Sequence, residues 1–223
     1  MHPAQPRFYD HIRAFLRRNP PLVRTLAVPP RRRIYTAGDD DRRIYFVESG
    51  GVKLGVTSDH GRDCLLDVMV EGDLFGESCL TGSHERLETA TTVSRTVLKA
   101  VAYEDVFPFL RHHSLYEPFM VELAARIGEL ESMVADNATL PSDRRLAKTL
   151  MRLAAKTPPS ADGQVRLPYR LSQEELADFV GTTRPRISTF MNRFRDEGLI
   201  DWTEDRFVMV RVDRLSAYLA SPL

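Results

Sequence analysis

A cluster of basic and hydroxyl side chains near the C-terminal end offers the clearest binding chemistry in the sequence. Four arginines and no acidic residue lie between Arg184 and Arg195. Apolar residues recur among them at spacings of three, one and three, which predicts a helix with one buried face and one basic face. Such a helix fits the major groove of B-DNA, where the residues of its first turns reach base edges. We therefore predict base contacts from Arg184, Arg186, Ser188 and Thr189.

The segment before this helix predicts the scaffold that would hold it. Ser172 and Glu175 form an S-x-x-E capping box, which is typical of a helix start. Gly181 then ends that short helix, because glycine tolerates the left-handed turn between two helices. Thr182 or Thr183 can cap the second helix, so residues 172–200 predict a helix-turn-helix. Polar side chains on this scaffold are natural phosphate contacts, and these candidates are Gln173, Thr182, Thr183, Asn192, Arg193 and Arg195.

Length and charge favour two domains. The chain has 223 residues, which is long for one compact domain, and a formal net charge of zero. Residues 141–223 hold 14 basic and 11 acidic side chains, whereas residues 1–140 hold 17 and 20, so the basic excess accompanies the helix-turn-helix. No apolar run has the length of a signal peptide or a membrane span. We expect a soluble, cytoplasmic protein without a membrane partner.

The region from Ile34 to Val101 has the pattern of strands. Short runs of β-branched and aromatic residues alternate with glycine-bearing turns about every ten residues, which predicts an antiparallel barrel or roll. Before it, Phe8, Ile12 and Leu16 predict one face of a helix, and residues 22–28 predict a further helical turn.

A longer helix is expected over residues 114–137. Four apolar residues recur along it at spacings of four, three and four, as in the seam of a coiled coil: Leu123, Ile127, Leu130 and Val134. Met120 and Ala124 are expected to face the roll, and the chain alone could bury the seam. Pro141 marks a hinge, after which Ser142 or Asp143 can cap a helix. Two short strands after Ile200 predict a wing beside the helix-turn-helix, and Asp213 is expected to cap a last helix.

Read together, these features resemble the CRP/FNR family of bacterial transcription regulators over nearly the whole chain. The motif Gly72-Asp73-Leu74-Phe75-Gly76-Glu77 is similar to that family's phosphate-binding cassette. The resemblance implies an α+β fold: an antiparallel β-roll over residues 1–113 with its helical lead-in, a dimerisation helix and hinge over 114–139, and a winged helix-turn-helix over 140–223. It also implies that the seam joins two copies of the chain, and that Gly76, Glu77 and Arg86 contact an effector.

The sequence departs from the family pattern at several ligand positions. Cyclic AMP-responsive members place a Thr-Ser pair where this chain has Leu130 and Glu131, so we expect an effector other than cAMP. Pro185 and Thr189 replace the common Glu and Arg of the recognition helix, so we expect a different operator. With two cysteines, an iron–sulfur cluster is not expected. Haem or a metal is not expected either, because its candidate ligands lack a diagnostic spacing: His60, Cys64, Cys79 and His84.

The predicted function is a homodimeric, sequence-specific DNA-binding transcription regulator whose roll senses an effector, with RNA polymerase as a partner that the resemblance allows. Two alternatives stay open. The same fold can bind DNA constitutively with a vestigial roll, or the chain can be a small-molecule-binding protein or enzyme whose C-terminal domain contacts protein. No nucleophile, base and orienting residue form a local catalytic motif, so an enzyme is not expected.

Overall fold

The computed structural model describes residues 8, 9, 12, 13, 16, 21–61, 63–82, 85–160 and 163–221. The chain divides into two compact units, Met1–Val56 with Leu66–Glu131, and Thr57–Leu65 with Ser132–Leu223. The division falls within one long helix, so the domain limits expected at residues 113 and 139 stay predictions. None of the helices within these described ranges has the length and apolar character needed to cross a bilayer.

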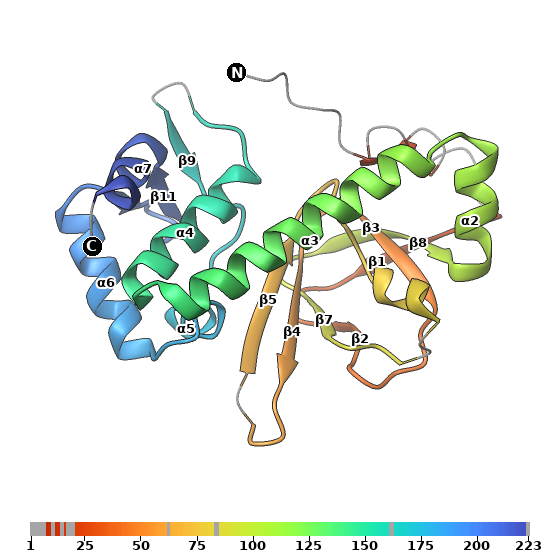
Figure 1. Cartoon of the computed structure of the whole chain (residues 1–223), viewed down its shortest axis with the longest axis horizontal. Helices are drawn as coiled ribbons and strands as arrows, with labels where there is room; N and C mark the ends of the chain where they lie inside the picture. The colour runs from red at the N-terminus through yellow and green to blue at the C-terminus, as the bar shows by residue number, and fades with distance from the viewer. Residues whose placement is uncertain are drawn as a thin grey trace. The chain divides into compact units, whose positions relative to one another are not determined.

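The first unit is built on two antiparallel four-stranded sheets, in the orders β1-β8-β3-β6 and β2-β7-β4-β5. Figure 1 labels the strands of both sheets except β6. The inward residues of both sheets are large and apolar, and Tyr45, Phe75 and Leu98 are fully buried. The roll predicted from the alternating pattern is therefore confirmed. Its strands are β1 (Val23–Val28), β2 (Arg33–Tyr35), β3 (Arg43–Ser49), β4 (Val52–Thr57), β5 (Asp63–Met69), β6 (Leu74–Phe75), β7 (Thr89–Thr92) and β8 (Thr96–Ala102).

One expectation at the N-terminal side of the roll is wrong. The segment predicted as a further helical turn is strand β1, which pairs antiparallel with β8 from Val23 opposite Val101 to Val28 opposite Thr96. Pairing of the whole segment along β8 satisfies its backbone groups, and this long-range partner outweighs the weak helical pattern. Of the predicted lead-in helix, Phe8, Ile12 and Leu16 are helical and buried against the outside of the roll.

Two helices follow the roll, α2 (Tyr103–His112) and α3 (Tyr116–Thr139), and α3 confirms the long helix expected over residues 114–137. The short 3-10 helix η1 (Glu77–Thr81) lies within the roll, between β6 and β7. Phe119 of α3 is buried in the same apolar cluster as Phe8, and the half-buried Leu123 packs against that cluster. In contrast, Met120 and Ala124 are exposed, so their expected contact with the roll is wrong.

The second unit contains the elements of a winged helix-turn-helix: α4 (Ser142–Ala155), β9 (Gln164–Arg166), α5 (Gln173–Val180), α6 (Arg184–Asp196), β10 (Ile200–Trp202), β11 (Val208–Arg211) and α7 (Val212–Ala220). The three strands form one antiparallel sheet in the order β10-β11-β9. Fully buried side chains of α4, α6 and β11 fill its core, among them Leu146, Leu150, Ile187, Phe194 and Val210.

The predicted helix caps of this unit are only partly correct. The capping box is confirmed, because Ser172 Oγ accepts from the Glu175 amide at 3.1 Å and Glu175 Oε2 accepts from the Ser172 amide at 2.9 Å. Helix α4 begins at Ser142 itself, without a side-chain cap. Asp213 likewise lies inside the first turn of α7 rather than before it.

Candidate nucleic-acid interface and effector site

The turn between α5 and α6 has the geometry that a helix-turn-helix requires. Gly181 adopts φ 67° and ψ 46°, a left-handed conformation that glycine reaches without the strain of a Cβ. The Thr182 amide donates to the carbonyl of Ala177 at 3.0 Å, which closes α5. Thr183 occupies the N-cap position of α6, but its side chain makes no capping bond. The first amides of α6 therefore lack a side-chain acceptor, and this end of the helix attracts anions.

The start of α6 presents the predicted base-reading residues to solvent. Arg184 and Arg186 are exposed. Arg184 has no hydrogen bond or ion pair with any residue that the structure describes, while the Arg186 guanidinium lies 5.8 Å from the ring centroid of Phe190. Ser188 is half-buried, and the exposed Thr189 donates its hydroxyl to the Pro185 carbonyl at 3.1 Å. Two guanidinium groups are thus available to a ligand at one end of the helix.

The predicted phosphate contacts fall into two groups. Thr183 and Asn192 are exposed, and Gln173 and Thr182 are half-buried, so all four reach the surface of the unit. The two arginines at the end of α6 have internal partners instead. Arg195 pairs with the neighbouring Asp196 at 2.9 Å, and Arg193 contacts Asp143 and Tyr218.

Arg193 connects the last turn of α6 to α4 and α7. Its Nη2 lies 2.7 Å from Asp143 Oδ2 and 3.0 Å from the Tyr218 hydroxyl, which itself donates to Asp143 at 2.9 Å. Burial acts to raise the pKa of Asp143, but the hydrogen bonds from Arg193 and Tyr218 outweigh it and hold that pKa below its usual value. The geometry therefore gives Arg193 a structural contact, and its role as a phosphate contact stays a prediction.

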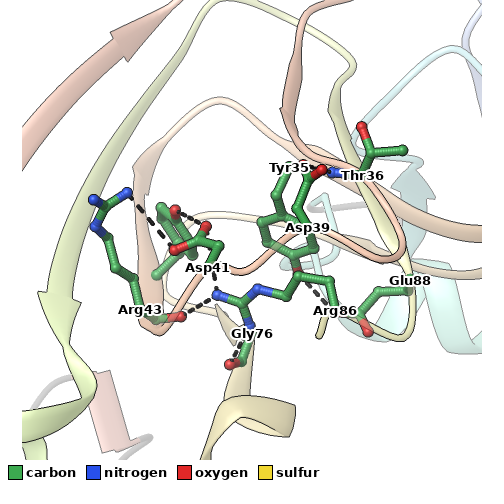
Figure 2. Close-up of polar contacts among 9 residues, drawn as sticks. Tyr35, Thr36, Asp39, Asp41, Arg43, Gly76, Arg86 and Glu88 are labelled. Atoms are coloured by element: carbon green, nitrogen blue, oxygen red, sulfur yellow. Dashed lines mark hydrogen bonds and ion pairs between the residues drawn. The ribbon is translucent and has the colours of Figure 1, made fainter. Parts of the chain in front are cut away.

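In the roll, the structure brings two of the three predicted effector residues into direct contact (Figure 2). Gly76 precedes η1 in a left-handed conformation, with φ 83°. The Arg86 guanidinium donates from Nη1 to the Gly76 carbonyl at 2.6 Å and from Nη2 to the Arg43 carbonyl. A Cβ on residue 76 would lie 2.8 Å from Arg86 Nη1 and 2.9 Å from that second carbonyl, so glycine is required there.

Aromatic and acidic side chains surround this guanidinium. Arg86 is only 2% exposed, and its Cζ lies 4.2 Å from the ring centroid of Tyr35. Asp41 Oδ2 is 3.6 Å from Arg86 Nη2 and accepts the Tyr45 hydroxyl at 2.5 Å. Burial and then the hydrogen bond to Asp41 raise the pKa of Tyr45 to about 12. The Tyr35 hydroxyl donates to buried Glu88 at 2.6 Å, and burial followed by the charge of Glu88 raises the pKa of Tyr35.

Glu77, the third predicted effector residue, is paired with α3. Its Oε1 lies 3.0 Å from Arg126 Nε, and the Arg126 guanidinium also donates to the Leu74 carbonyl at 3.1 Å. The carboxylate expected to meet an effector is therefore held by a cation on the helix that carries the apolar seam.

Most of that seam is exposed in the single chain. Ile127, Leu130 and Val134 are 57%, 44% and 69% exposed. Met120, seven residues before Ile127, is 59% exposed, whereas Leu123 between them is half-buried against the roll cluster.

Sequence reasoning missed the residues that surround the predicted ones. Asp41 lies in a run of three aspartates that reads as an ordinary turn, and Arg126 precedes a seam position without a motif of its own.

Three of the four metal or haem candidates, His60, Cys64 and Cys79, lie among the described residues. Within that part of the chain, no group of three or more His, Cys, Asp or Glu side chains is suited to a metal. Cys64 is exposed and Cys79 is buried, and His84 lies outside the described residues.

Two protein-family models match the chain, one over the roll and one over the helix-turn-helix. Residues 25–113 match the family model of the cyclic nucleotide-binding domain, and residues 144–218 match that of the Crp-like helix-turn-helix domain. A CRP-like cAMP-activated global transcriptional regulator from Mycobacterium tuberculosis is 27% identical over 168 residues, 75% of each chain. A global nitrogen regulator from Synechocystis is 26% identical over 193 residues, 85% of each.

Solved structures share the fold. The regulator CLP of Xanthomonas campestris, described as responsive to c-di-GMP, aligns with a TM-score of 0.71 at 23% identity, covering 90% of this chain and 98% of its own. FixK2 of Bradyrhizobium japonicum aligns with a TM-score of 0.76 at 17% identity, covering 90% and 99%. The names of these relatives point to different signals, so the likeness supports the architecture rather than one ligand.

Proposed function

Because the chain belongs to the CRP/FNR family of bacterial transcription regulators, we propose that it is a homodimeric, sequence-specific DNA-binding regulator rather than an enzyme. The observation that carries the proposal is the pair of exposed guanidinium groups of Arg184 and Arg186 at the start of α6. Arginine recognises guanine through O6 and N7, and unpaired guanidinium groups need not break an internal contact to do so.

The exposed stripe on α3 supports the dimer. Met120, Ile127, Leu130 and Val134 follow the heptad spacing at which two helices pack along a shared seam. A contiguous apolar stripe on a helix is costly in water and is stabilised when an identical stripe covers it. In a two-fold dimer the recognition helices would meet half-sites about one DNA turn apart.

The link between Glu77 and Arg126 supports a route from the roll to α3. An effector or covalent change that alters the cassette would change the ion pair that holds α3 against the roll, at 3.0 Å in this structure. The equilibrium between arrangements of the recognition helices would shift accordingly, because a ligand favours the state to which it binds better.

Constitutive DNA binding is the second candidate. It is favoured by the internal partners of Arg86, since a guanidinium already held by two carbonyls and a carboxylate leaves less for an effector. Operator affinity of the purified protein without added ligand distinguishes the two candidates: a tight complex supports constitutive binding.

The proposal is tested by selecting a preferred DNA sequence from a random library with the full-length protein. Affinity should fall steeply with salt, because phosphate contacts release counterions. Arg184→Ala should lower discrimination at one base position by roughly 10- to 100-fold, or about 1–3 kcal/mol. Arg111→Ala, which removes an exposed arginine from α2 in the other unit, is the matched control.

Unchanged base preference in Arg184→Ala would remove its reading role. Complete absence of salt-dependent DNA binding would overturn the proposal and favour a C-terminal domain that contacts protein.

A further inference from the structure

We propose that Asp41 determines the ligand specificity of the roll. It serves as the internal counter-ion of Arg86, so that the site formed by Arg86 and the Gly72–Glu77 cassette does not bind phosphate esters such as cyclic nucleotides. The inference deepens the sensor role proposed above and rests on it for its regulatory meaning. The chemistry can nevertheless be tested without DNA.

Arg86 is the group that a phosphate would need. It is the one arginine buried in the part of the chain that the structure describes, and it lies within the region that matches the cyclic nucleotide-binding domain. Every cyclic nucleotide carries an anionic phosphate, for which a guanidinium is the best-suited side chain. In this chain the guanidinium already donates to the carbonyls of Gly76 and Arg43, and the Tyr35 ring covers one face.

Asp41 supplies the negative charge in place of a ligand. Its Oδ2 lies 3.6 Å from Arg86 Nη2, and its side chain is 12% exposed, so solvent screens the pair weakly. The Tyr45 hydroxyl fixes the same oxygen, while Arg43 Nη1 lies 3.6 Å from Oδ1. Two backbone hydrogen bonds hold Arg86 against the turn that carries Asp41, because the Arg86 amide donates to the Asp39 carbonyl and the Gly38 amide donates to the Arg86 carbonyl.

A phosphate approaching Arg86 would therefore meet a like charge. It would have to approach the Asp41 carboxylate closely or displace it from both Tyr45 and Arg86. Buried Glu88 accepts the hydroxyl of Tyr35, the ring that the guanidinium faces, and so adds a second carboxylate to this part of the roll. A phosphate within contact distance of the Asp41 carboxylate would be repelled strongly in a poorly hydrated site. Replacing the carboxylate by the phosphate would give little net binding free energy, because Arg86 would only exchange one anion for another.

The test is calorimetric titration of the full-length protein with cyclic AMP and cyclic GMP. The wild type should bind neither with a dissociation constant below about 1 mM. Asp41→Asn keeps the shape and an acceptor for Tyr45 but removes the charge, so it should bind at least roughly tenfold more tightly. Adding Arg86→Gln to that variant should abolish the gain. Asp40→Asn, an exposed neighbour in the same turn, removes an equal charge and should leave binding unchanged.

Wild-type binding below about 1 mM, or a gain in Asp41→Asn that survives the loss of Arg86, would overturn the inference. No gain in a folded Asp41→Asn variant would overturn it as well. If that variant unfolds, Asp41→Ser takes its place; if both unfold, the wild-type titration decides. DNA binding measured on the same samples separates this inference from the proposed function. A wild type that binds neither cyclic nucleotides nor DNA contradicts only the proposed function.

Discussion

Placing a charge on the exposed seam of α3 tests the dimer most directly. Leu123 is unsuitable because it packs against the apolar cluster of the roll, and its loss would destabilise the single chain. Ile127 is 57% exposed and lies in the middle of the stripe, so Ile127→Asp should leave the fold intact and act on association alone.

The size of the effect follows from burial and charge. Fully burying an isoleucine contributes about 1.5–3 kcal/mol, so the 57% of Ile127 left exposed corresponds to about 1–1.5 kcal/mol per chain. Because a two-fold dimer buries Ile127 of both chains, the substitution removes about 2–3 kcal/mol of burial free energy. The two aspartates that then face each other add at least about 1–2 kcal/mol of desolvation and repulsion. The total, about 4 kcal/mol, weakens the dimer by roughly a thousandfold.

Sedimentation equilibrium over a range of concentrations measures the outcome. The wild type should have twice the 25.4 kDa of one chain at concentrations where the variant has the mass of one. Ser132→Asp adds the same charge to an exposed position off the seam and should remain dimeric. A variant with the mass and dissociation constant of the wild type would refute the assignment of this stripe to the dimer contact.

Two further changes test the second unit. Ser172→Ala removes the capping box and should lower the free energy of unfolding by about 1 kcal/mol in denaturant titrations, whereas exposed Ser216→Ala should not; equal values would contradict the cap. The lowered pKa of Asp143 means that its pairing with Arg193 stabilises the fold at neutral pH and that this contribution is lost as pH falls through the folded-state pKa. Asp143→Asn should therefore be less stable than the wild type at neutral pH and should lose less stability on acidification, as measured by thermal melts. Asp213→Asn, the control, should behave like the wild type. Stability curves of Asp143→Asn and the wild type that run parallel with pH would contradict the ion pair.

The helix-turn-helix could be predicted because its determinants are close in sequence. The capping box spans Ser172 to Glu175, and Gly181 ends the same helix six residues later. Both signals can be recognised in the sequence without knowledge of the tertiary structure. The strands of the roll were likewise predictable, since alternation of buried and exposed residues is a property of each segment alone.

The rest depended on partners far apart in the chain. Strand β1 is defined by β8, about 70 residues later, and Asp41 meets Arg86 across 45 positions. A run of aspartates in a turn has no pattern that identifies which carboxylate turns inward. In the same way, the arginines of α6 look equivalent in sequence, and only Asp143 and Tyr218 distinguish Arg193 from Arg184.

This difference between the two arginines has a consequence for how such regulators can diverge. Arg193 binds the last turn of α6 to α4 and α7, whereas in the first turn Arg184 and Arg186 have no hydrogen bond or ion pair with any described residue. Substitutions at Arg184 or Arg186 should therefore change the preferred DNA sequence at little cost in folding. Under the proposed function, substitutions in the first turn of α6 can change the preferred DNA sequence while the contacts of Arg193 that stabilise the domain are kept.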